Sequence, residues 1–265
     1  MKSFTSLALT ATFSLMAFAS QAFSAEAPTC QRFRIFNFGA ENGNTFYKNS
    51  GISKLTPKNI PGQLPWCKGV YVHNYSFAVD NNGFLPHLIG TNFGTVPSGL
   101  GGYSGRSREY QNLIASFPKL GKFHMFVFWP SSGDFRMGLD WANDYSDNAK
   151  TVINNIRANL GVRNSKTGKV YSPVFFPQVQ TSKLSNDLVA ANPWIQMMEP
   201  EVKQLQEGAA RAYGTANSVK IIQTSKINVY SDGYTLTPAG SKIMASNIVY
   251  VWNKYQSWDG TFKYK

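Results

Sequence analysis

The chain has 265 residues, of which 43% are hydrophobic and 15% are charged. This length is enough for one α/β domain with a substantial core and is short for two. The composition excludes an intrinsically disordered protein, and the mean hydropathy of -0.26 excludes a membrane protein with many spans.

The formal net charge is +12, which favours contact with anionic partners such as acidic glycan, lipopolysaccharide, nucleic acid or a membrane surface. Ordinary solubility of a basic exported protein explains this charge equally well. The basic residues are spread along the chain without a run of five, and we expect no specific nucleic-acid partner.

The first 24 residues have the pattern of a secretory signal peptide. Lys2 supplies a basic start, residues 7–19 form an apolar run, and Ala22 and Ser24 are small residues of the kind that a signal peptidase reads. A short membrane anchor is the alternative, but the run falls short of the roughly 20 residues that a span requires. We therefore expect an exported protein, periplasmic or secreted, with no integral membrane segment after the leader is removed.

The two cysteines, Cys30 and Cys67, make an even pair, which in an exported chain is most simply one disulfide. A metal site is disfavoured because His73 lies six residues after Cys67 and the other histidines are scattered. We expect neither a metal nor a cofactor.

Hydrophobic periodicity divides the rest of the chain into alternating strands and helices. Strands are predicted at 32–38, 69–79, 123–129, 172–180 and 219–223, and helices at 141–160, 194–213 and 237–255. This order predicts a three-layer α/β/α sandwich with a central, mostly parallel sheet. We expect a single domain over 25–265, with an irregular insertion around 45–120.

The irregular stretch contains many turn residues and many aromatic residues. Aromatic rings beside a cleft can stack on sugars, although most are expected to lie in the core. Long irregular segments above a sheet edge often shape a substrate groove. Arg106, Arg108 and Lys122 could line an anion-binding groove there, with a solvated loop as the alternative.

Four short motifs carry a resemblance to a known family. Residues 39–42 (Gly-Ala-Glu-Asn) follow the first strand, and residues 129–134 (Trp-Pro-Ser-Ser-Gly-Asp) end the central strand. The next helix carries Tyr145, Arg157 and a Leu-Gly stop at 160–161, and residues 232–240 (Asp-Gly-Tyr-Thr-Leu-Thr-Pro-Ala-Gly) precede the last helix. Over roughly 34–252, the chain resembles the SGNH hydrolase superfamily, in particular its sialate O-acetylesterase-like carbohydrate esterases.

The resemblance implies an SGNH or flavodoxin-like α/β fold. It places Glu41, Asp232 and Thr235 at the nucleophile, acid and base positions of the family. Ser131 and Ser132 replace the glycine and the acid of the middle turn. The binding residues implied around these positions are Gly39, Asn42, Ser132, Asp134 and Arg106.

These departures predict that the inherited catalytic machinery is degenerate. Thr235 has no basic site that titrates near neutral pH, so even a serine hydroxyl at position 41 would be a poor nucleophile. Loss of the triad in a serine hydrolase costs on the order of a millionfold in rate. We therefore expect a protein that binds glycan or another anionic envelope component through the former active-site cleft.

Glu41 has a physical rationale at its position. A helix N-terminus presents unpaired backbone N–H groups, which favour an anion. We hypothesise that the Glu41 carboxylate permanently fills the site where an oxyanion forms transiently in the enzymes.

Three alternatives remain open at this stage. The chain could be an active carbohydrate O-acetyl esterase whose nucleophile or base lies outside the family pattern, or a purely structural or partner-binding envelope protein. Glu41 with Asp134 or Asp232 could also form the carboxylate pair of a glycoside hydrolase.

Ser104 does not form a nucleophile elbow, because Arg106 occupies the position of the second glycine. His124 lies in an apolar strand and is expected to be a core histidine.

Overall fold

The computed structural model describes residues 30–39, 41–59, 64–76, 108–129, 153–163, 172–178, 219–223 and 235–254, together with 165, 168 and 170. Its elements follow in the order β1 (Phe33–Gly39), α1 (Glu41–Asn49), the 3-10 helix η1 (Ile52–Lys54), β2 (Val70–Ser76), α3 (Arg108–Leu120), β3 (Met125–Trp129), β4 (Val174–Gln178), β5 (Val219–Gln223) and α7 (Pro238–Lys254). Residues 153–160 form a further helical segment.

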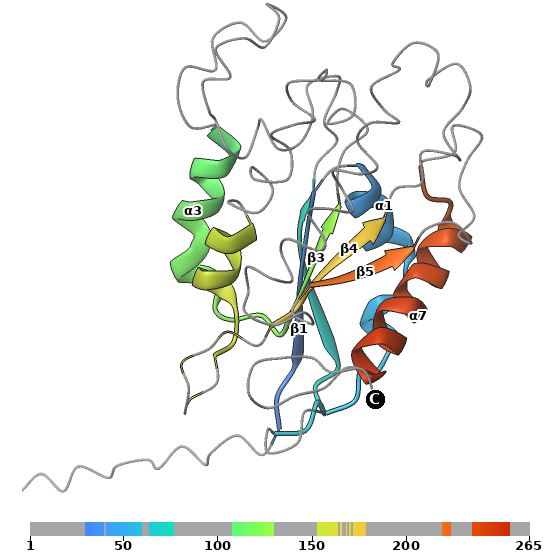
Figure 1. Ribbon diagram of the computed structural model, residues 1–265, viewed down its shortest axis with the longest axis horizontal. Helices are drawn as coiled ribbons and strands as arrows, with labels where there is room; N and C mark the ends of the chain where they lie inside the picture. The colour runs from blue at the N-terminus through green and yellow to red at the C-terminus, as the bar shows by residue number, and fades with distance from the viewer. Residues whose placement is uncertain are drawn as a thin grey trace, which may run out of the picture.

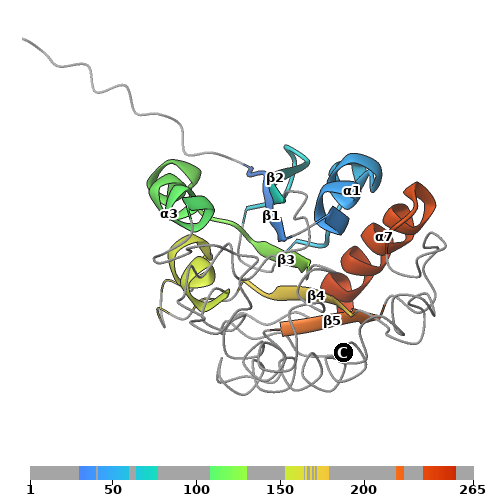
Figure 2. The same ribbon diagram turned by 90° about the horizontal axis from the view of Figure 1, so that it is seen from above.

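The strands form one five-stranded sheet in the order β2-β1-β3-β4-β5, and each of its described strand pairs is parallel. Helices α1 and α7 cover one face of the sheet, and α3 with the helical segment 153–160 covers the other (Figures 1 and 2). The predicted α/β/α sandwich with a parallel sheet is therefore confirmed. No helix in the described part of the chain combines the length and the apolar character needed to cross a membrane.

The side chains of β1 alternate between two apolar layers. Phe33 packs edge-on against Trp252 of α7, with ring centroids 4.7 Å apart, whereas Phe36 packs against Phe123 at 5.1 Å on the opposite face. All four rings are fully buried. A buried side chain of this size stabilises the fold by about 1.5–3 kcal/mol, which explains why the strand is almost continuously apolar.

The predicted strands are all present, with ends that differ by at most three residues, and the last helix is confirmed as α7.

Helices α1 and α3 were not predicted, because α1 begins in the Gly/Asn-rich turn and α3 lies in the stretch interpreted as irregular. The sequence of α1, Glu-Asn-Gly-Asn-Thr-Phe-Tyr-Lys-Asn, contains few strong helix formers. Tertiary packing stabilises it instead, since Phe46 lies against Trp129 with ring centroids 5.1 Å apart. The predicted helix at 194–213 and the first part of that at 141–160 lie outside the described residues.

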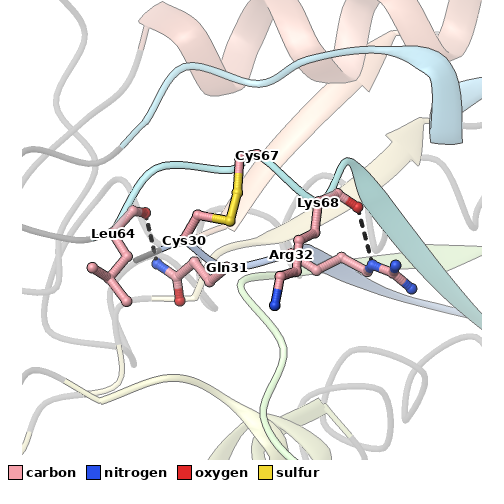
Figure 3. Close-up of a disulfide and its surroundings, with 6 residues drawn as sticks. All are labelled: Cys30, Gln31, Arg32, Leu64, Cys67 and Lys68. Carbon is pink, nitrogen blue, oxygen red and sulfur yellow. Dashed lines mark hydrogen bonds between the residues drawn. A yellow bond between two sulfur atoms is a disulfide. The ribbon is translucent and has the colours of Figure 1, made fainter. Parts of the chain in front are cut away.

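A disulfide joins Cys30 to Cys67, with their Cα atoms 5.7 Å apart, as predicted (Figure 3). Two side chain to main chain hydrogen bonds flank it. Gln31 Nε2 donates to the Leu64 carbonyl and Arg32 Nε donates to the Lys68 carbonyl, each over 3.0 Å. Together these contacts fix the segment before β2 against the start of β1, at the amino end of the parallel pair.

His124 is a core histidine, as expected. Its Nδ1 accepts a hydrogen bond from the main-chain N–H of Arg34 over 3.0 Å, and its ring stacks on Phe33 and meets the edge of Trp66. Burial, and secondarily the positive charge of Arg34, lowers the pKa of His124 from 6.5 to about 4. The imidazole is therefore neutral at physiological pH and serves as an acceptor within the core.

Candidate functional site

The candidate site lies at the carboxyl edge of the sheet. Gly39, the last residue of β1, pairs with Ser76 of β2 and Trp129 of β3, so three adjacent strands end at the same level. Helix α1 begins two residues later at Glu41. In open parallel sheets, ligands bind at this edge because the loops and helix N-termini that follow the strands converge there.

Glycine is required at the end of β1. Gly39 has a φ of +127°, a conformation that L side chains rarely adopt, and a Cβ atom there would lie 2.1 Å from the carbonyl oxygen of Trp129. Gly43 in α1 is similarly confined, because a Cβ would lie 2.4 Å from the hydroxyl of Ser76. The two glycines allow the first turn of α1 to sit directly on the ends of β2 and β3.

A hydrogen bond joins this turn to the loop before α7. The side-chain oxygen of Asn42 accepts from the main-chain N–H of Leu236 over 2.8 Å, and both residues are buried. Glu41 directly precedes Asn42, and Thr235 directly precedes Leu236. The segments that carry two of the three motif positions are thus in contact at the carboxyl edge, although 194 residues separate the bonded pair.

A buried amide supports the turn from below. Asn37 is fully buried in β1, and its Oδ1 accepts from the indole N–H of Trp129 over 2.8 Å. Its Nδ2 lies 2.9 Å from the Gly43 carbonyl, 2.7 Å from Asn74 Oδ1 and 3.1 Å from Ser76 Oγ. One amide thereby links the three strand ends to the first turn of α1. Sequence reasoning did not assign this role to Asn37, for which the available signal was a polar residue within an apolar strand just before the glycine turn.

Two helix N-termini open at the same edge. Thr237 caps α7, since its Oγ1 accepts from the main-chain N–H of Gly240 over 3.0 Å, and Pro238 occupies the first helical position. Helix α1 begins at Glu41, and the N-terminus of a helix carries the positive end of its dipole. The positive ends of both helix dipoles therefore lie near the predicted site.

Four predicted site residues lie outside the described part of the chain: Asp232, Ser132, Asp134 and Arg106. Their placement at the site stays a prediction. Arg157, which carried part of the family resemblance, lies away from the carboxyl edge. Its side chain is buried and donates to the carbonyls of Ser172 and Val170, each over 2.7 Å, which fixes the helical segment 153–160 to the chain leading into β4.

The described histidines do not supply a base at this edge. His124 packs against Phe33 at the start of β1, and Gly39 is six residues further on, about 20 Å along an extended strand. His73 lies halfway along β2 and stacks on Phe36 of β1. Burial, with a smaller contribution from Arg34, lowers the pKa of His73 below 6.5. The described part of the chain also contains no cluster of His, Cys, Asp and Glu that could hold a metal ion.

No protein-family model matches the sequence, and no curated protein matches it significantly. Similar solved structures include a Slackia heliotrinireducens protein proposed to be an SGNH hydrolase, with 12% identity, a TM-score of 0.48, and coverage of 83% of this chain and 98% of the other. A carbohydrate acetylesterase family member from Sinorhizobium meliloti has 10% identity and a TM-score of 0.45, with coverage of 84% and 99%. A family two carbohydrate esterase from Clostridium thermocellum, solved with cellohexaose, has 13% identity and a TM-score of 0.45, with coverage of 84% and 64%.

Each of the three TM-scores is below 0.5 and each identity is below 25%. Any function proposed for this chain therefore has to be argued from its own residues.

Proposed function

We propose that the chain is an exported glycan-binding protein built on an SGNH-type carbohydrate esterase frame that has lost catalysis. The observation that carries the proposal is the hydrogen bond between Asn42 and Leu236, which holds the segment of Glu41 against that of Thr235. A carboxylate and a threonine hydroxyl then occupy neighbouring segments where an attacking hydroxyl and an imidazole would be needed. Neither group performs the role required for acyl transfer.

Export is supported by two features of the sequence and the fold. The first 24 residues have the pattern of a secretory leader. The disulfide between Cys30 and Cys67 suits an oxidising compartment outside the cytosol. An envelope or secreted location would bring the protein into contact with glycans.

Glu41 also restricts what the carboxyl edge can bind. A permanent carboxylate at the N-terminus of α1 would offset the positive potential of the helix dipole, which would otherwise attract an anionic ligand. Sugar hydroxyls can donate hydrogen bonds to that carboxylate, whereas an anionic group would be repelled. We therefore infer that the carboxyl edge binds uncharged parts of a glycan.

The proposal is tested by combining an ester-hydrolysis assay with a glycan-binding assay on the purified protein. A panel of acetylated sugars should show no saturable deacetylation, while a glycan array should show saturable binding. Saturable deacetylation would instead support the competing function, a carbohydrate O-acetyl esterase that uses residues outside the family pattern. Absence of both activities would favour a structural or partner-binding envelope protein.

A further inference from the structure

A second candidate binding site lies at the opposite end of α1 from Glu41. A pocket of about 550 Å³ is formed there by the last turn of α1, the η1 segment, the first residues of β2 and one side chain of α7. Its lining includes Tyr47, Lys48, Lys54, Tyr71 and Lys242. Eight residues separate Glu41 from the end of α1, which is about 12 Å along the helix axis, so this pocket is distinct from the carboxyl edge.

The pocket concentrates positive charge. Lys48, Lys54 and Lys242 come from three different elements, and the described lining contains no Asp or Glu. Among the described residues, none forms an ion pair with any of these three ammonium groups. The stretches that the structure describes hold 14 Lys and Arg but only two acidic residues, Glu41 and Glu109. Since nothing in the described lining neutralises the three lysines, the pocket favours an anionic ligand.

The pocket also offers groups suited to a sugar. Tyr47 is 47% exposed, so its ring is accessible and can pack against the apolar face of a pyranose. The hydroxyl of Ser53 and the main chain of the first residues of β2 supply hydrogen-bonding groups. β2 is at the end of the described sheet order and pairs with β1 along one edge, so main-chain groups on its other edge face away from the sheet.

We propose that this pocket binds a short acidic saccharide, with the three lysines contacting its carboxylate, phosphate or sulfate groups. The volume is within the range of small-ligand sites, about 300–1,000 Å³. A concave pocket of this size admits a few sugar rings, whereas a nucleic-acid duplex or a bilayer presents a broad surface. This pocket would bind anionic groups, whereas Glu41 disfavours them at the carboxyl edge. The proposal for the pocket does not depend on the loss of catalysis.

The test uses the full-length mature protein and two probes, tetragalacturonate as the acidic saccharide and cellotetraose as the uncharged one, in isothermal titration calorimetry. The protein should bind tetragalacturonate more tightly than cellotetraose, and rising salt should weaken the tetragalacturonate affinity. The triple variant K48Q/K54Q/K242Q should bind tetragalacturonate about tenfold more weakly. Tyr47→Ala should reduce binding of the acidic probe with little change in its salt dependence.

The matched control is the triple variant K58Q/K68Q/K119Q, which removes the same charge from exposed lysines outside the pocket lining. It should keep the wild-type affinity. Equal losses in both triple variants would overturn the proposal, because binding would then follow net charge rather than the pocket. Absence of tetragalacturonate binding, or tighter binding of a tetranucleotide that depends on the same three lysines, would also overturn it. Esterase activity of the wild type would contradict the proposed loss of catalysis and would leave this pocket unaffected.

Discussion

Asn42 accepts the main-chain N–H of Leu236 over 2.8 Å and so connects the first turn of α1 to the loop that leads into α7. Leu236 is 1% exposed, so its N–H has no access to solvent if the acceptor is lost. The bond directly joins the segments that carry Glu41 and Thr235, and it makes their proximity a testable property of the fold.

Replacement of Asn42 should therefore destabilise the protein. Asn42→Ala leaves a buried N–H without its acceptor, and we expect a loss of about 1–3 kcal/mol in the free energy of unfolding. Urea denaturation monitored by tryptophan fluorescence measures this loss. Thr45→Ala is the matched control on the same helix, since the Thr45 side chain is only partly buried and should cost less. Equal stability of the Asn42 variant and the wild type would show that the two segments are held together by other contacts.

Substitution of Asn37 should destabilise the protein more than substitution of its hydrogen-bond partner Asn74. Asn37→Leu removes the acceptor of the Trp129 indole and the donor to the Gly43 carbonyl, and we expect a loss on the order of 3 kcal/mol. Asn74→Ala removes one bond from a half-buried side chain and should cost on the order of 1 kcal/mol. Thermal unfolding by circular dichroism ranks the two variants, and a smaller effect at Asn37 than at Asn74 would contradict the network described above.

His124 should make stability dependent on pH in the acidic range. Its pKa is lowered from 6.5 to about 4, so the unfolded chain binds a proton at this residue before the folded protein does. The contribution is fully present above pH 6.5 and is lost as the pH falls from 6.5 towards 4, by up to about 3 kcal/mol. His73, whose pKa is also lowered, adds an effect of the same sign.

The variant His124→Asn isolates this effect. Its side-chain oxygen can replace Nδ1 as the acceptor for the Arg34 N–H, but it does not titrate. The variant is expected to be less stable than the wild type at pH 7 and to lose less stability between pH 7 and pH 4. Denaturant unfolding at a series of pH values provides the comparison, and parallel pH profiles for the two proteins would rule out His124 as the source.

Several parts of the fold follow from local sequence. The apolar runs at 33–38 and 123–129 identify the central strands, and the Thr237-Pro238 pair identifies the start of α7. Helix α1 could not be predicted in this way, because its Asn-Gly-Asn-Thr sequence favours turns and its stability depends on contacts with Trp129 and Leu236, which are distant in sequence. The apolar residues of α3 do have helical spacing, but the helix directly follows a stretch rich in turn residues, and the whole region was therefore interpreted as irregular.

The candidate site was predictable only where a motif marked it. Gly39 and Asn42 stand in a recognisable turn, and the structure gives each a specific role there. The support from Asn37 depends on strand register, which no local pattern reveals. The pocket around Lys48 and Lys242 combines four separate segments and therefore leaves no continuous signal in the sequence.

The loss of catalysis is tested most directly by steady-state hydrolysis of p-nitrophenyl acetate by the wild type and the double variant Glu41→Ser/Thr235→His, with each single variant as a control. Restoring a hydroxyl and an imidazole to adjoining segments should produce saturable hydrolysis in the double variant, with little in either single variant. The wild type should not exceed the uncatalysed rate. Saturable hydrolysis by the wild type, or a folded double variant with no activity, would contradict the account.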